Sequence, residues 1–314
     1  MRRILRVEVA SGSVSLFGTY HPPQDGAATH AAGPGAGKPG VLFINFGQFD
    51  RAGPANLTVH LAERLAEHGY PVFRFDMPGL GDTAGDLPEH FETYWQFVEQ
   101  SGEVPWTCEL VAALKQRFAL PGLLLGGLCG GAMTSIFAAE RLNGQVQGLL
   151  LLEPPIFLSR PPPAQGTATT TGLGYDTTPE SRAQADLEEG RLHKAYRWVR
   201  TRASDSRCGG VLRRSRDKVG CVVAAFTSPR FPPNTNLCLI ESWQKLGAAG
   251  MPMLVLCAPG ASQQIIRRDI CRLNHRSRIT IRDIARTNHL FTSGGGRQAV
   301  LDEVQHWTTA NFPA

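Results

Sequence analysis

Short, mostly apolar segments alternate along this chain with segments of helical periodicity. The expected strands are residues 41–45, 70–75, 123–128, 146–152, 253–256 and 279–284. The expected helices include the turns that carry Leu57, Leu61 and Leu65, and residues 88–100, 105–118, 132–142, 263–273 and 300–307. Strands in which apolar residues follow one another without alternation are buried on both faces, which is typical of a parallel sheet between layers of helices. The sequence therefore predicts an α/β protein with a mostly parallel central sheet.

Two parts of the chain depart from this alternation. Residues 4–9 and 14–20 form an expected N-terminal hairpin of strands. Residues 156–245 contain no series of strands: they begin with runs of proline and threonine and then become basic and helical in pattern. We interpret them as a largely helical lid inserted into one domain, whose core is formed by residues 1–155 and 246–314. A length of 314 residues fits such a domain as well as it fits two separate domains.

Composition excludes several classes of protein. A net charge of +5 is too mild to argue for nucleic-acid binding. No apolar run approaches the ~18 residues of a membrane span, and the basic N-terminus lacks the apolar stretch of a secretory signal. The seven cysteines include no C-x-x-C pair, which disfavours zinc and thioredoxin-like sites. We therefore expect a cytoplasmic protein with free thiols and without a metal or organic cofactor.

The most informative motif is the Gly-x-Cys-x-Gly sequence formed by Gly127, Cys129 and Gly131, between an apolar strand and a helix. A tight strand-to-helix turn strains its central residue, and the two glycines remove side chains that would collide there. The thiol would lie at a helix N-terminus, where the helix dipole favours a thiolate. The motif predicts that Cys129 is a nucleophile. The alternative is a glycine-rich turn with a buried cysteine.

With this motif the chain resembles the α/β-hydrolase superfamily, in the form that carries cysteine in place of serine, as dienelactone hydrolases and some thioesterase-like members do. The resemblance covers about residues 6–312, the lid excepted. Further stretches resemble landmarks of the family. Residues 45–48 lie where the family has His-Gly after its third strand, residues 74–82 resemble the loop after the fourth, and residues 288–291 resemble the loop of the catalytic histidine.

The resemblance implies a base and an acid for Cys129. The base is His289, in the loop after the last strand. The family's usual acid position, after residues 253–256, has no carboxylate before Asp269. Many thioesterase domains of biosynthetic assembly lines place the acid at the end of the sixth strand, where this chain has Glu153. Glu153 is therefore the expected acid, while Asp269, Asp283 and a Cys–His pair without an acid remain alternatives.

The oxyanion hole of such a site needs two backbone donors. The first is expected to be the N–H of Gly130, directly after the nucleophile. The second is expected to be the N–H of Gln48. Phe46 replaces the family's histidine, so Gly47 stays open as the alternative donor.

Positive charge is concentrated in residues 191–218, which hold ten cationic and two anionic side chains. A solvated helical face would explain this composition. The alternative is a docking surface, centred on Arg213, Arg214 and Arg216, for an anionic partner: a phosphopantetheine arm, an acidic acyl or peptidyl carrier protein, or coenzyme A.

The sequence thus predicts an acyl hydrolase or acyltransferase that works through a covalent acyl-cysteine. A thioesterase-like activity on a small acyl substrate is expected first, because thiolate attack on a thioester is nearly thermoneutral. A lactone or ester hydrolase of the dienelactone hydrolase type is the alternative enzyme. A non-catalytic ligand-binding protein of the same fold is the alternative from another class.

Overall fold

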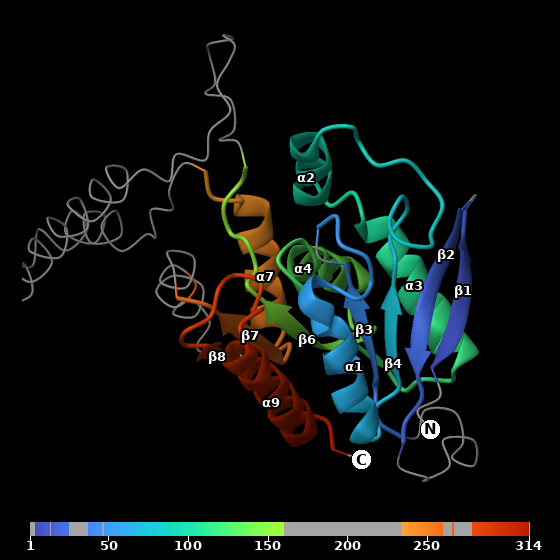
Figure 1. Cartoon of the computed structure of the whole chain (residues 1–314), viewed down its shortest axis with the longest axis vertical. Helices are drawn as coiled ribbons and strands as arrows, with labels where there is room; N and C mark the ends of the chain where they lie inside the picture. Colours follow the sequence, from blue (N-terminus) through green and yellow to red (C-terminus); the bar gives the residue numbers. More distant parts are fainter. Residues whose placement is uncertain are drawn as a thin grey trace, which may run out of the picture. The chain divides into compact units, whose positions relative to one another are not determined.

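A mixed sheet of eight strands forms the centre of the computed structural model (Figure 1), which describes residues 4–12, 14–24, 37–45, 47–159, 234–259, 266 and 278–313. The strands are β1 (Leu5–Ser11), β2 (Val14–His21), β3 (Gly40–Ile44), β4 (Val72–Phe75), β5 (Leu123–Leu128), β6 (Val146–Leu152), β7 (Met253–Cys257) and β8 (Ile279–Asp283). Their order in the sheet is β1-β2-β4-β3-β5-β6-β7-β8. Strand β2 is antiparallel to β1 and β4, and all the other pairs are parallel.

Helices cover both faces of this sheet. They are η1 (Pro54–Asn56), α1 (Leu57–Glu67), α2 (Phe91–Glu99), α3 (Val104–Arg117), α4 (Gly130–Leu142), α7 (Leu237–Ala248) and α9 (Gly294–Asn311). Helices α1 and α9 pack together on one face, and α4 lies between α3 and α7 on the other (Figure 1). This two-sided cover explains why every residue of β3, β4, β5 and β7 is buried.

The core is built from the apolar strands that define the sequence pattern. Leu123, Leu124 and Leu125 of β5 and Leu149 and Leu150 of β6 are completely buried. Burial of each such side chain is worth roughly 1.5–3 kcal/mol. Strand β8 is partly exposed because it lies at the edge of the sheet. The structure therefore confirms the predicted α/β class and the mostly parallel sheet.

Several predicted boundaries need correction. Strand β4 begins at Val72 and not at residue 70, because Pro71 has no N–H to donate to a strand ladder. Helix α4 begins at Gly130 and not at residue 132, because Cys129 is already its N-cap. Helix α2 begins at Phe91, later than the predicted residue 88. The predicted helix 263–273 lies outside the described residues, apart from Ile266.

The chain divides into two compact units, Met1–Arg160 with Asn234–Ala314, and Pro161–Pro233. The first unit holds the sheet. The second lies outside the described residues, so the lid predicted for residues 156–245 stays a prediction. The last part of that range belongs to α7, which packs against α4 in the first unit.

The two ends of the undescribed stretch 160–233 are joined within the first unit. Phe157 and Thr235 form an antiparallel β-bridge. The N–H of Leu158 donates to the carbonyl of Asn234 at 2.7 Å, and the N–H of Asn236 donates to the carbonyl of Ile156 at 2.8 Å. The chain therefore leaves and re-enters the first unit at a single place. None of the helices in the described residues has the length and apolar character needed to cross a bilayer.

Candidate active site

The carboxyl ends of β3 and β5 meet where the winding of the sheet changes direction. After β3 the chain continues through α1 to β4, and after β5 it continues through α4 to β6 on the opposite side. Open α/β sheets bind ligands outside the carboxyl ends of their strands at such a switch point. The loop that contains Gly47 and Gln48 and the turn at Cys129 both begin there.

Cys129 occupies the strained turn between β5 and α4. Its backbone angles are φ 52° and ψ −111°, a conformation that typically costs about 1–3 kcal/mol for a residue other than glycine. Its N–H donates to the carbonyl of Leu152 at 2.8 Å, and its own carbonyl accepts from Ala132 and Met133 at 3.0 and 3.1 Å. These bonds fix the turn between two neighbouring strands.

The two flanking glycines are required by close backbone approach. A Cβ at Gly127 would lie 2.4 Å from the carbonyl carbon of Gly131, and a Cβ at Gly131 would lie 2.5 Å from the carbonyl oxygen of Asn45. Both distances are shorter than the non-bonded contacts that Cβ atoms make in proteins. The tight strand-to-helix turn that the sequence predicts is therefore present.

The resting state of the thiol differs from the prediction. Trp95 and Val98 of α2 pack against Gly130, and Cys129 is only 7% exposed. This burial raises the pKa of Cys129 to about 12; the N–H of Gly130 opposes the rise and the nearby charge of Glu153 adds to it. The expectation that the helix N-terminus favours a thiolate is thus wrong for the resting protein, because desolvation outweighs the helix. A nucleophilic role for this thiol would require a base that takes its proton during the attack.

The structure brings Glu153 and His289 together. Glu153 directly follows β6, and its N–H donates to the carbonyl of Leu256 at 2.8 Å. One carboxylate oxygen accepts from the N–H of Ala258, and the other lies 3.1 Å from Nδ1 of His289. If Nδ1–H donates to the carboxylate, Nε2 carries the lone pair that can accept a proton.

The His289 loop is anchored next to the ring. Phe291 is completely buried, and the side chain of Asn288 accepts from the N–H of Thr292 at 3.1 Å. Of the alternative acids, Asp283 is the exposed last residue of β8, and Asp269 lies outside the described residues. Sequence reasoning did not identify Phe291 as an anchor, although a large apolar residue beside a loop histidine is a usable signal.

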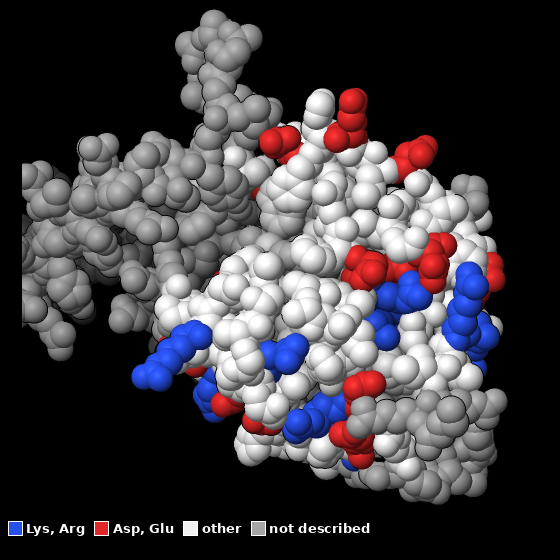
Figure 2. Space-filling view, viewed as in Figure 1, with Lys and Arg blue, Asp and Glu red and all other residues white. Residues whose placement is uncertain are grey.

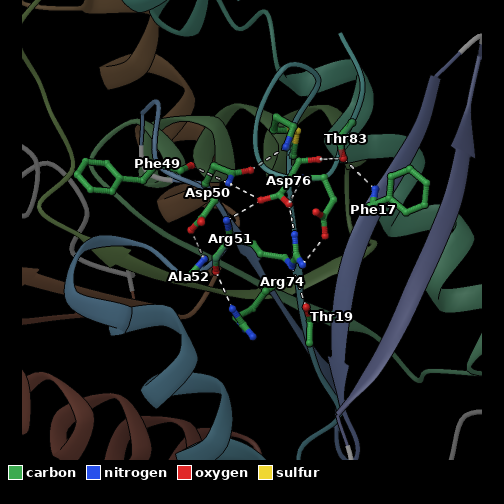
Figure 3. A network of polar contacts seen from close by, with 12 residues as sticks. Phe17, Thr19, Phe49, Asp50, Arg51, Ala52, Arg74, Asp76 and Thr83 are labelled. Carbon is green, nitrogen blue, oxygen red and sulfur yellow. Dashed lines mark hydrogen bonds and ion pairs between the residues drawn. The ribbon is translucent and has the colours of Figure 1, made fainter.

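The loop after β3 is held by a polar network that the sequence analysis missed (Figure 3). Asp76 is completely buried and accepts from the N–H of Arg51 at 2.6 Å and from the Arg51 guanidinium. Asn45 accepts from the N–H of Met77 at 2.8 Å and donates to the carbonyl of Phe49 at 3.0 Å. The loop that carries Gly47 and Gln48 is therefore tied on both sides to the residues that follow β4.

Arg74 extends this network into the sheet. It donates to the carbonyl of Arg51 at 2.9 Å and lies 3.0 Å from Nε2 of His21. Burial, and after it the charge of Arg51, lowers the pKa of Arg74 to about 10. A charged residue inside an apolar strand, followed two positions later by a carboxylate, is the sequence signal that points to this network.

The structure describes only some of the remaining predicted residues. Gly47 has φ 47° and is buried, whereas Gln48 is exposed; Phe46 between Asn45 and Gly47 lies outside the described residues. Arg213, Arg214 and Arg216 also lie outside them. On the face shown in Figure 2, the basic side chains that the structure describes are interspersed with acidic ones. In the described part of the chain, no three His, Cys, Asp or Glu side chains form a cluster that could hold a metal ion.

Comparison with known proteins gives similarity in structure but not in sequence. No family model and no curated protein matches the chain. A dienelactone hydrolase from Anabaena variabilis matches with a TM-score of 0.54 and 14% identity, over 99% of this chain and 98% of its own. An esterase from Pyrococcus furiosus matches with a TM-score of 0.56 and 12% identity, over 100% and 92%.

A third structure, described as a member of the α/β serine hydrolases without a lid, comes from Xanthomonas campestris. It matches with a TM-score of 0.51 and 14% identity, over 99% of this chain and 96% of its own. These likenesses extend over the whole sheet and its helices. Together with the strand order and the turn at Cys129, they show that the chain has the α/β-hydrolase fold.

Proposed function

We propose that the protein is an acyl hydrolase that carries the acyl group on Cys129. The observation that carries this proposal is the 3.1 Å contact between His289 and Glu153 next to the strained turn of Cys129. The residue before Glu153, Leu152, accepts a hydrogen bond from the N–H of Cys129, so both groups belong to one edge of the sheet. A nucleophile, a base and an orienting carboxylate are the three parts of a catalytic triad for acyl transfer.

The first half of the reaction forms the acyl-enzyme. Nε2 of His289 accepts the thiol proton while the sulfur attacks the substrate carbonyl carbon, and Glu153 stabilises the imidazolium. The N–H groups of Gly130 and Gln48 receive the negative charge on the carbonyl oxygen. As the carbonyl re-forms, the bond to the leaving group breaks and the imidazolium gives it the proton.

The second half releases the acid. His289 accepts a proton from water, the oxygen of that water attacks the thioester carbon, and the thiol leaves with the proton from the imidazolium. With an alcohol, amine or thiol in place of water the same steps transfer the acyl group. The elevated pKa of Cys129 fits this scheme, because the thiol then behaves as a serine hydroxyl does and ionises only during attack.

Carboxylic esters and lactones are the favoured substrates. The structural neighbours include proteins named as a dienelactone hydrolase and as an esterase. Thioesters of coenzyme A or of a carrier protein are the second candidate, because a cysteine nucleophile exchanges with a thioester at little free-energy cost and because residues 191–218 are strongly basic.

Intact-mass spectrometry tests the proposal. The protein is mixed briefly with 4-nitrophenyl butyrate, a saturated lactone or butyryl coenzyme A, and the mass gain is mapped to a residue. We expect one acyl group on Cys129 and none on Cys129→Ala, with weak turnover by Cys129→Ser. Undiminished turnover by Cys129→Ala would overturn the covalent mechanism. Neither capture nor turnover with any of the three would favour the non-catalytic ligand-binding protein.

A further inference from the structure

A completely buried carboxyl group lies behind the candidate site and has no part in the reaction described above. Glu103 directly precedes α3 and is 2% exposed. One of its carboxyl oxygens lies 2.9 Å from the hydroxyl of Tyr94 in α2. The other accepts from the hydroxyl of Thr134 in α4 at 3.2 Å. Glu103 thus connects α2 with the helix that begins at the nucleophile.

Tyr94 carries this connection to the loop after β3. Its hydroxyl donates to the carbonyl of Gly47 at 2.7 Å. That carbonyl and the N–H of Gln48 belong to one planar peptide unit, and in a trans peptide they point in opposite directions. No cis peptide occurs in the part of the chain that the structure describes. Holding the Gly47 carbonyl toward Tyr94 therefore turns the Gln48 N–H away from Tyr94.

The number of hydrogen atoms available to these hydrogen bonds defines the protonation state of Glu103. The Gly47 carbonyl can only accept, and the Tyr94 hydroxyl has a single hydrogen. Two contacts to Tyr94, at 2.7 and 2.9 Å, need two hydrogens. The second must come from the carboxyl of Glu103, which is then neutral. An ionised Glu103 would draw the Tyr94 hydrogen to itself, since a charged acceptor is the stronger one, and the Gly47 carbonyl would lose its donor.

The surroundings of Glu103 favour the neutral form. From α2 the titratable group that contacts it is Tyr94, while Glu99 bonds to Ser159. The charged groups of the neighbouring elements have other partners or positions. In α3, Glu109 bonds to Ser11, and in the loop after β3, Arg51 pairs with Asp76. In α4, Cys129 precedes the first turn and Arg141 lies in the last turn. Among the described residues no cation is paired with Glu103, and its burial raises its pKa to about 7.

We propose that Glu103 is a positioning residue of the acyl transfer: in its neutral form it makes Tyr94 donate to the Gly47 carbonyl, which aims the Gln48 N–H at the oxyanion. This inference rests on the proposed function. It assigns the second oxyanion donor to Gln48 rather than to Gly47. It also predicts an activity that declines at alkaline pH for a reason separate from the base His289.

The test compares pH profiles of kcat, with a chromogenic ester, for the wild type and three variants. In Glu103→Gln the amide donates to Tyr94 and accepts from Thr134 but cannot ionise. We expect this variant to retain wild-type kcat at pH 6 and to show no decline of kcat above about pH 7.

Tyr94→Phe removes the connection itself and should lower kcat by about tenfold or more with little change in KM. Glu99→Gln is the matched control, since Glu99 is a second buried carboxyl, in α2, that bonds elsewhere; it should keep the alkaline decline.

The outcomes separate this inference from the proposed function. An alkaline decline in Glu103→Gln equal to that of the wild type, or unchanged kcat in Tyr94→Phe, overturns the positioning role. If Glu103→Gln does not fold, Tyr94→Phe decides alone. In that variant a changed KM with an unchanged kcat also overturns the positioning role. Full activity in Cys129→Ala removes the proposed function, whereas an inactive Cys129→Ala together with an unchanged Glu103→Gln profile removes the inference alone.

Discussion

Nδ1 of His289 lies 3.1 Å from a carboxylate oxygen of Glu153, although 136 positions separate the two residues in the chain. Strand β6 ends directly before Glu153, and the loop after β8 carries His289. The two strands are separated in the sheet by β7 alone. The sheet therefore brings the imidazole into contact with the residue that follows the sixth strand.

Replacing Glu153 by glutamine should reduce kcat by about two to four orders of magnitude, because the imidazole loses the charge that fixes its tautomer. Glu153→Asp should recover part of this, since the shorter side chain displaces the oxygen. Steady-state kinetics checks both variants, and thermal unfolding serves as the control for stability. A kcat within about twofold of wild type in Glu153→Gln would falsify the orienting role.

Cys129 should react slowly with a simple alkylating reagent at neutral pH. Its pKa is raised to about 12 by burial, so the thiolate is scarce until the pH rises well above 9. Acylation by an activated ester should nevertheless be fast, because His289 removes the proton during attack. Peptide mass spectrometry measures both rates at Cys129, with the exposed Cys238 as internal reference. Faster alkylation of Cys129 than of Cys238 at pH 7 would contradict the desolvated thiol.

Asp76→Asn should lower the free energy of unfolding by about 2–4 kcal/mol, because it leaves the Arg51 guanidinium without its buried partner. It should also reduce kcat, since the loop that carries Gln48 loses a tie. Asp82→Asn removes the other, half-exposed carboxylate of Arg51 and should cost less than about 1 kcal/mol. Urea unfolding of the two variants and the wild type measures both losses of free energy. Equal losses would mean that burial of Asp76 does not determine its contribution.

Glu103 should make the stability of the protein depend on pH. Its folded pKa of about 7 lies above the value of an unfolded glutamate, so its stabilising contribution is present in acid and is lost as the pH rises toward 7 and beyond. Relative to Glu103→Gln, the wild type should lose roughly 3 kcal/mol between about pH 4 and pH 8. Urea unfolding at a series of pH values measures the difference. A difference that does not change with pH would show that the pKa of Glu103 is the same in the folded and the unfolded protein.

Neutralising Arg213, Arg214 and Arg216 to glutamine should raise KM for a coenzyme A thioester and leave that for a small neutral ester unchanged. The same KM in the wild type should rise with salt, because exposed charges are screened. Kinetics with butyryl coenzyme A and 4-nitrophenyl butyrate at low and high salt provides the comparison. Salt-independent kinetics with the thioester speaks against docking of an anion at these positions.

The sequence predicts those parts of this protein that depend on residues close together in the chain. Continuous runs such as residues 123–128 and 146–152 identify β5 and β6 to the residue, and Gly127 and Gly131 identify the turn between β5 and α4. The contact of Glu153 with His289 is predictable because the carboxyl ends of parallel strands share an edge.

The parts that escape prediction depend on residues far apart in the chain. Arg51 meets Asp76 because β3 and β4 are adjacent, and the sequence contains no local mark of that adjacency. Glu103 sits in a helix cap that looks solvated until α2 and α4 bury it. The thiolate expected at Cys129 fails for the same reason, since Trp95 reaches the turn from another helix.

The β-bridge between Phe157 and Thr235 holds together the two ends of the chain between them. Because Leu158 already bonds to Asn234 at 2.7 Å, a tight hairpin turn can close the gap without moving either end. Cys129, Glu153 and His289 all lie outside the excised stretch. Residues 160–233 can therefore be shortened or exchanged as one piece, while Cys129, Glu153 and His289 stay where the first unit places them.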